Sequence, residues 1–191
     1  MNRKKKEVTV WVAETALLLA LLVVFQLLTF IVPKGVPLVS QFCTGTLVNM
    51  VLIVGAGSVG LSGTAVAAVV SPLLAYAFGQ MPFPQMLPVV AVGNLIIVVI
   101  IWFFFRPSAD ATAPGLCRSL LGIVVGAAVK SMFLWGMTVW FILPMLFAGK
   151  AKVAEKLSMM FSWPQAITAV AGGVLALLVL PAIRTYRIKH T

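Results

Sequence analysis

Residues 95–105 read LIIVVIIWFFF, an unbroken apolar run in which apolar and polar side chains do not alternate. A strand of a membrane barrel would alternate over roughly 10 residues, whereas a helix that crosses a membrane needs roughly 20 predominantly apolar residues. Extending the run back to residue 86 gives a stretch of that length. The run therefore predicts a membrane-spanning helix over residues 86–105.

The same apolar character extends over the whole chain of 191 residues. Hydrophobic residues make up 62% of the sequence and charged residues 9%, whereas a soluble domain is about 45–50% apolar and about 25% charged. With short loops, the length allows about six spans. We therefore predict an all-α integral membrane protein that forms one compact six-helix bundle over residues 1–191. The predicted transmembrane helices cover residues 8–32, 42–58, 62–79, 86–105, 116–147 and 162–183.

Helix-breaking residues and charges mark the segments between these helices. Two prolines and a glycine in residues 33–37 end the first helix. Residues 116–147 are longer than one crossing, so this helix is predicted to be tilted or to break near Gly136 or Pro144. The sequence predicts a hydrophilic loop, which could be amphipathic, over residues 149–158.

The formal net charge of +10 predicts an orientation. Lys and Arg lie at the chain ends and in short gaps, rather than along one face as in a nucleic-acid-binding protein. Most fall on the side of the N-terminus, which predicts that both termini are cytoplasmic. The basic residues 3–6 could begin a signal peptide, but the apolar run after them is too long, so we expect a retained helix. The lysines on the predicted external side are Lys34, Lys150, Lys152 and Lys156.

Side chains that usually carry catalysis are scarce. His190 is the single histidine, and the chain has four carboxylates. They do not form a nucleophile–base pair, a carboxylate pair or a metal-ligand cluster, and no Gly-rich phosphate loop occurs. Cys43 and Cys117 lie far apart without other ligands nearby. We expect no catalytic residues, no cofactor and no metal site, and any dependence on ATP would have to come from another subunit.

Lys130 is the most informative ionisable residue, because it lies near the middle of the predicted helix 116–147. A charge inside the bilayer is costly unless it faces a cavity or a partner. Lys130 could therefore meet an anionic group of a ligand, or it could snorkel, bond to backbone carbonyls or fix helix packing. Glu14, about two turns into the first helix, is expected at the membrane interface.

Other polar and aromatic side chains cluster in the predicted outer halves of the helices. Asn94 could share the depth of Lys130. Trp135 could line the same pocket or lie at the membrane interface, and residues 82–84, with Phe83, would form part of a lid. The polar residues could instead bond between helices, each bond worth about 0.6 kcal/mol. The candidate substrate-binding residues are Asn49, Phe83, Asn94, Lys130, Trp135, Trp163 and Gln165.

In order and spacing, several segments resemble the substrate-binding S component of energy-coupling factor (ECF) vitamin transporters. The resemblance covers nearly the whole chain and includes the basic N-terminus. It also includes Ala16 and Ala20, which share one face of the first helix and could face a partner or pack internally. The other matching segments are residues 71–79 (SPLLAYAFG), 87–94 (LPVVAVGN), 128–130 (AVK) and 161–165 (FSWPQ).

The resemblance implies a subunit of the bacterial cytoplasmic membrane that captures a vitamin or related micronutrient at the outer face. A T component and two ATPase subunits would supply coupling and energy, and the S component would topple to release its cargo inside. The family's alanine motif faces the T component, which here implies Ala16 and Ala20. The resemblance does not identify the vitamin, although Lys130 favours an anionic group on it.

Two other classes of function remain open. A self-contained secondary transporter usually shows inverted repeats, and residues 1–95 show no convincing similarity to residues 96–191. A structural or assembly subunit of a membrane complex would need no ligand pocket. Association with a T component and two ATPases would separate these classes from an S component.

Overall fold

The computed structural model describes residues 3–31, 37–81, 83–106 and 115–190, and this part of the chain is helical and contains no strand. This confirms the predicted all-α class. The predicted break over residues 33–36 and Pro82 of the predicted lid lie outside the described residues. The helices are α1 (Arg3–Leu27), α2 (Pro37–Ser58), α3 (Leu61–Ala77), α4 (Leu87–Phe105), α5 (Leu116–Gly136), α6 (Leu143–Leu146), α7 (Ala151–Met160) and α8 (Trp163–His190).

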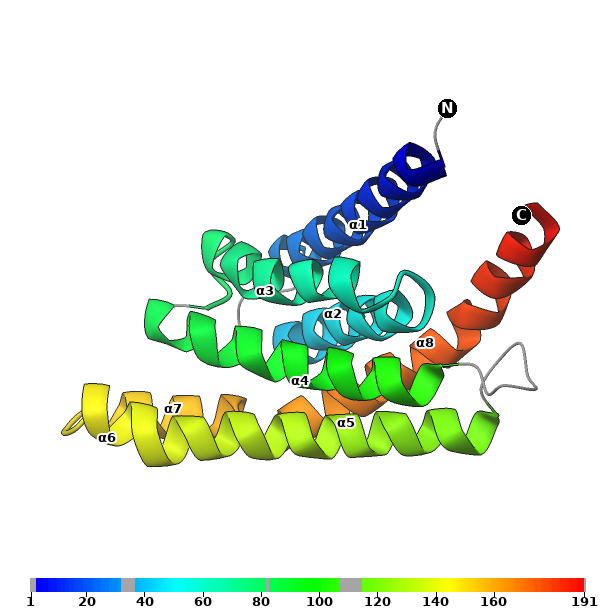
Figure 1. Cartoon of the computed structure of the whole chain (residues 1–191). Helices are drawn as coiled ribbons and strands as arrows, with labels where there is room; N and C mark the ends of the chain where they lie inside the picture. Colours follow the sequence, from blue (N-terminus) through cyan, green and yellow to red (C-terminus); the bar gives the residue numbers. More distant parts are fainter. Residues whose placement is uncertain (1–2, 32–36, 82, 107–114, 191) are drawn as a thin grey trace.

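Several of these helices have the length and composition of membrane spans, which is compatible with a multi-pass membrane protein. α3 is also apolar but has only 17 residues. α4 and α5 run side by side, and the start of α1 and the end of α8 lie toward the same end of the bundle (Figure 1). Within the described residues, five stretches are long and apolar enough to cross a membrane: Glu7–Leu27, Val39–Ser58, Pro84–Phe105, Leu116–Leu146 and Ala151–Tyr186.

The ends of the predicted helices shift in several places. α1 ends at Leu27 and is followed by a 3₁₀ turn over Leu28–Phe30. α2 begins at Pro37, because proline is favoured in the first turn, where its missing N–H is not needed. α8 continues to His190, beyond the predicted end at residue 183. Between α2 and α3 the chain turns at Gly60, whose φ of 102° is rarely open to a residue with a side chain.

The predicted helix 116–147 does not break at Gly136 or Pro144. α5 continues through a π-helical segment, Met137–Ile142, directly into α6. Pro144 has no N–H to donate, and its ring would clash with a carbonyl in a regular α-helical turn. The wider turns of the π-helical segment lie directly before this proline and accommodate it.

The prediction of a loop over residues 149–158 is wrong, because α7 covers most of it. Val153, Leu157 and Met160 recur at helical spacing and pack into an apolar cluster with Phe161. An amphipathic helix can form here because its apolar stripe is buried while its charged face stays solvated. The exposed residues on this face are Lys152, Glu155 and Lys156.

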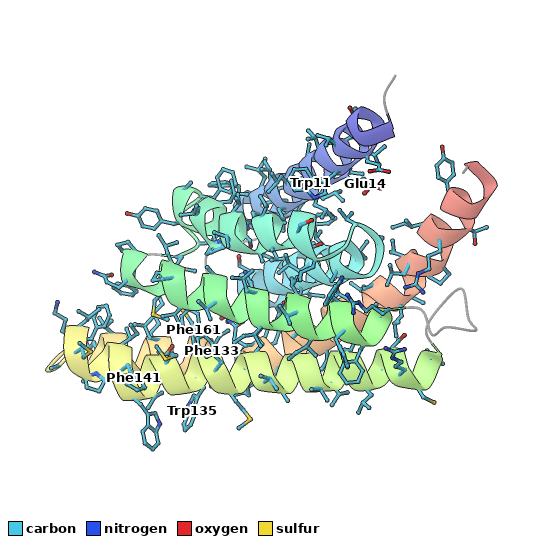
Figure 2. The ribbon with its side chains drawn as sticks, in the orientation of Figure 1. Trp11, Glu14, Phe133, Trp135, Phe141 and Phe161 are labelled. Carbon is cyan, nitrogen blue, oxygen red and sulfur yellow. The ribbon has the colours of Figure 1, made fainter. Side chains whose placement is uncertain are left out.

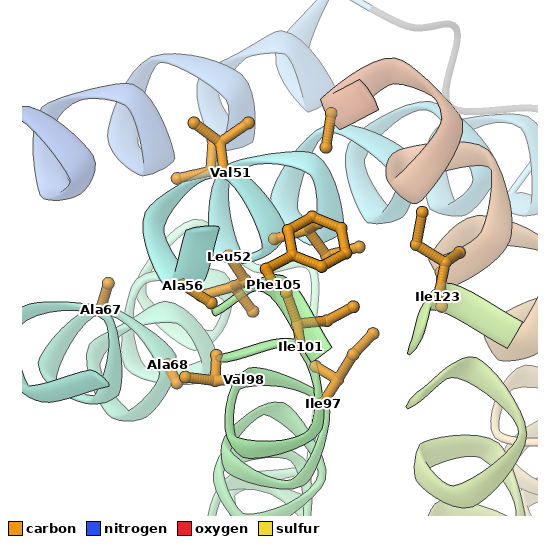
Figure 3. Close-up of a cluster of buried hydrophobic side chains, with 14 of the residues drawn as sticks. Val51, Leu52, Ala56, Ala67, Ala68, Ile97, Val98, Ile101, Phe105 and Ile123 are labelled. Carbon is orange, nitrogen blue, oxygen red and sulfur yellow. The ribbon is translucent and has the colours of Figure 1, made fainter. Parts of the chain in front are cut away.

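One half of the bundle is filled by a packed apolar core (Figure 3). α2 lies at its centre and packs against α1, α3, α4 and α8. α8 approaches α2 so closely at Gly172 that an added Cβ would lie 2.6 Å from the carbonyl oxygen of Thr46. Small residues permit such close approaches between membrane helices. Buried core residues include Leu18, Leu22, Leu52, Ile97, Ile101 and Ile123.

Candidate functional site

A layer of buried polar side chains borders this core, with one residue from each of α1, α2, α3, α4, α5 and α8. In α1, Gln26 lies one turn beyond the core residue Leu22. In α5, Lys130 lies three residues beyond the core residue Ala127. The same change from apolar to polar in six helices creates one polar level in the bundle. We call these residues the polar layer: Gln26, Asn49, Ser71, Asn94, Lys130 and Thr168.

Lys130 is the centre of this layer and, among the described residues, the only charged side chain that is buried, with 3% of its surface exposed. Its Nζ donates hydrogen bonds to Asn49 Oδ1 at 2.7 Å and to Asn94 Oδ1 at 2.8 Å. These partners are neutral, and no carboxylate of the described residues pairs with Lys130. The ammonium is therefore solvated by amide dipoles while its charge is left uncompensated.

The two asparagines are oriented by their other hydrogen bonds. Asn49 Nδ2 donates to the carbonyl oxygen of Gly45 at 2.9 Å and to Thr168 Oγ1 at 3.4 Å. Asn94 Nδ2 donates to the carbonyl oxygen of Ala68 at 3.4 Å. Because both amide nitrogens have partners elsewhere, both amide oxygens face Lys130. The network thus joins α2, α3, α4, α5 and α8 and holds the lysine in place.

A cavity of about 960 Å³ lies against the polar layer. Five of the seven predicted substrate-binding residues line it: Asn49, Phe83, Asn94, Lys130 and Gln165. Seven of the other lining residues are aromatic or sulfur-containing. These side chains are Phe30, Phe78, Phe161, Met81, Met86, Met159 and Met160.

The rim of the cavity is held by glutamines. Gln41 Nε2 and Gln165 Nε2 donate to the same carbonyl oxygen, that of Met160 at the end of α7, at 2.7 and 3.1 Å. Beyond the C-terminal end of α3, Gln80 Nε2 donates to the carbonyl oxygen of Gln26 at 2.8 Å. Phe83 packs edge-on against Phe147, with ring centroids 5.0 Å apart. α7 and the segment after α3 are therefore fixed at the cavity wall.

Two predicted residues do not line the cavity. Trp135 comes five residues after Lys130, which turns it about 140° around the helix. It points away from the bundle and is 44% exposed (Figure 2). Trp163 is 53% exposed and packs against Phe42, with ring centroids 5.8 Å apart. Neither tryptophan belongs to the polar layer. The position at the membrane interface that the sequence suggested for Trp135 stays a prediction.

Gln26 and Ser71 line the cavity but were not predicted from the sequence. Gln26 is 1% exposed, and its Nε2 donates to the carbonyl oxygen of Ser71 at 3.0 Å. Its Oε1 accepts no hydrogen bond from the described residues. Gln26 is the only strongly polar residue in the apolar run 16–28. A polar group inside an apolar span needs a partner, and this rule, applied to Lys130, would also have identified Gln26.

Ala16 and Ala20 lie on the exposed face of α1. The face of α1 that enters the core instead carries Leu18 and Leu22. Internal packing of the two alanines, one of the alternatives from the sequence, is therefore wrong. The exposed face is free of bulky side chains at these two positions.

The chain was compared with family models, curated proteins and solved structures, and none of the three comparisons found a match.

Proposed function

We propose that this protein is the substrate-capturing subunit, or S component, of an ATP-driven ECF importer in a bacterial cytoplasmic membrane. It binds a vitamin or a related micronutrient with an anionic group in the cavity between the helices. ATP is hydrolysed by two partner ATPases, and a T component couples them to this chain. The orientation has both termini in the cytoplasm and the cavity toward the outer face.

The observation that carries the proposal is the cavity with Lys130 at its floor. Its volume of about 960 Å³ is within the range of small-molecule sites, about 300–1,000 Å³. Such sites combine mostly apolar walls with a few polar groups that orient the ligand. The aromatic and methionine side chains supply these walls here, and the polar layer supplies the orienting groups. A buried ammonium without a carboxylate partner favours an anionic ligand.

The exposed alanines support the second part of the proposal, the association with a membrane partner. Ala16 and Ala20 are one turn apart on the same face of α1 and leave room for another helix to approach its backbone. This face is separate from the cavity. A solitary secondary transporter or a structural subunit without a ligand would not need both features.

Co-purification tests the assignment to a transporter. The tagged full chain, extracted from its native membrane in mild detergent, should bring down a membrane-embedded scaffold subunit and two ATPases, identified by mass spectrometry. Isolation of the chain without these proteins would contradict the assignment. Native mass spectrometry of the same preparation against a panel of vitamins should then find a bound acid.

Replacing Ala16 and Ala20 with leucine separates the two surfaces. The bulkier side chains should prevent close helix approach and reduce the recovery of the partner subunits at least severalfold. Binding of the ligand to the isolated chain should stay unchanged, because both alanines are outside the cavity. Leucine at Ala128, which is exposed on α5 and does not line the cavity, is a control for added bulk on another helix. Loss of ligand binding in the double variant would contradict a partner-facing role.

A further inference from the structure

The cavity has a second polar pole, formed by Gln26 of α1 and Ser71 of α3. Gln26 Nε2 donates a hydrogen bond to the carbonyl oxygen of Ser71 at 3.0 Å and lies 3.4 Å from Ser71 Oγ. This bond fixes the plane of the amide, so that Oε1 points away from it. Oε1 is buried and has no partner among the described residues, and Gln26 lines the cavity. A buried carbonyl oxygen that lacks a donor is costly, about 1–3 kcal/mol.

The two poles have opposite requirements. Lys130 offers a positive charge and N–H donors, and therefore binds an acceptor. Gln26 Oε1 is an acceptor, and therefore binds an N–H or O–H donor. Both poles are anchored on α3, at Ala68, which accepts from Asn94, and at Ser71. Three residues of helix, ~4.5 Å of rise, separate these anchors, so both poles are held at neighbouring turns of α3.

We infer that the ligand is a small ring-containing acid whose carboxylate meets Lys130 and whose N–H or O–H group donates to Gln26 Oε1. This inference rests on the proposed function and adds a substrate class to it. The ring is accommodated by the phenylalanine and methionine walls, since thioethers and aromatic edges both make favourable contacts with aromatic rings. Gln26 is then a specificity-determining residue, because an analogue that lacks the donor leaves Oε1 unpaired.

Matched probes test this inference on the full chain in detergent. The first set is indole-3-propionate, its N-methyl derivative and indole-3-propionamide. The second set is 4-hydroxyphenylacetate, its methyl ether and 4-hydroxyphenylacetamide. Within a set, the first probe has both groups, the second lacks the donor and the third lacks the carboxylate. We expect the first probe of at least one set to bind about tenfold more tightly than the other two, measured by titration calorimetry.

Two substitutions of glutamine by methionine test whether Gln26 causes the preference for a probe with a donor group. Gln26→Met keeps the length of the side chain and removes Oε1, so the preference for the donor should fall from about tenfold to about onefold, while the preference for the carboxylate persists. Gln85→Met changes an exposed glutamine that does not line the cavity and should keep both preferences. Unchanged elution and melting midpoint establish that each variant is folded. Should Gln26→Met fail this check, Ser71→Ala, which keeps the backbone carbonyl that holds Gln26, must retain the preference.

The inference is overturned if Gln26→Met retains the preference for the donor. It is also overturned if neither set contains a probe with both groups that binds better than its partners. These results leave the proposed function intact, provided that the chain still associates with a T component and two ATPases. Loss of that association, with both preferences present, would instead reject the importer and keep the substrate class.

Discussion

The two halves of the bundle are built from the same helices in different ways. In the half that contains Leu52, Ile101 and Phe105, apolar side chains fill the space between the helices. In the other half, the helices surround a cavity of about 960 Å³. They are held together by hydrogen bonds at the polar layer and at the rim, and by the smaller apolar cluster around Phe161. The polar layer is the boundary between the halves.

This difference shows how a small membrane protein can combine a rigid fold with a binding site. Apolar burial gives little driving force between helices in lipid, so close packing and interhelical hydrogen bonds must hold them together. The packed half supplies shape complementarity, including the close approach at Gly172. Because the packed half stabilises the fold, the other half can contain a cavity and buried polar groups without hydrogen-bond partners. Substitutions in the two halves should therefore affect different properties.

The largest expected effect is on ligand binding, at the boundary itself. Lys130→Met should weaken binding of an acidic ligand by roughly tenfold or more, because a charge-assisted contact worth about 1.5–3 kcal/mol is lost. The melting midpoint should change little, because the removal of a buried uncompensated charge offsets the loss of the donor to Asn49 Oδ1 and Asn94 Oδ1. Calorimetry with the acid found in the vitamin panel measures the first effect, and thermal unfolding in detergent measures the second.

Lys156→Met is the matched control, because Lys156 also lines the cavity but is exposed. Its contribution is screened by solvent, and the expected change in affinity is below about threefold. Unchanged affinity in Lys130→Met together with a lower melting midpoint would make Lys130 a packing residue. The polar layer would then contribute to the stability of the fold and not to ligand binding.

A somewhat smaller effect is expected on stability where α8 crosses α2. Gly172→Ala would place a Cβ 2.6 Å from the carbonyl oxygen of Thr46 and 2.8 Å from Asn49 Cβ. The two helices must move apart, at a cost of about 1–3 kcal/mol in the free energy of unfolding. Gly136→Ala, where an added Cβ meets nothing within 4 Å, should be neutral or stabilising. Equal melting midpoints for the two variants would show that α2 and α8 do not depend on this close approach.

Hydropathy and helix geometry were enough to predict part of the fold and of the site. Long apolar runs predicted six membrane-spanning helices, and five stretches of the described residues are long and apolar enough to cross a membrane. The costly charge at Lys130 pointed to a position that lines the cavity. Asn94 was placed near Lys130 by counting the rise along two antiparallel helices, and the structure brings them within 2.8 Å. These predictions depend on composition and on helix rise, both of which can be read locally.

Other features depend on packing between distant segments and were not predicted. α7 was predicted as a loop because charged residues are frequent in residues 149–158. Its packing with Phe161 reveals the buried stripe. Trp135 was considered for the pocket without taking into account the rotation around the helix that turns it outward. Gln26 was overlooked because a glutamine is less conspicuous than a charge, although both need a partner inside a membrane.

The smallest expected effect is on the free energy of unfolding, when the same substitution, valine to alanine, is made in each half of the bundle on one helix. Val98 of α4 is buried in the packed core, whereas Val90, two turns earlier, is half-buried and lines the cavity. Val98→Ala should lower the free energy of unfolding by about 1–2 kcal/mol, because it opens a void among close-packed side chains. Val90→Ala loses some packing against the apolar cluster around Phe161 but mainly enlarges an existing space, so it should cost less than about 1 kcal/mol and change the ligand affinity. Equal losses of stability, measured by unfolding in mixed micelles, would mean that the cavity wall is packed as tightly as the core.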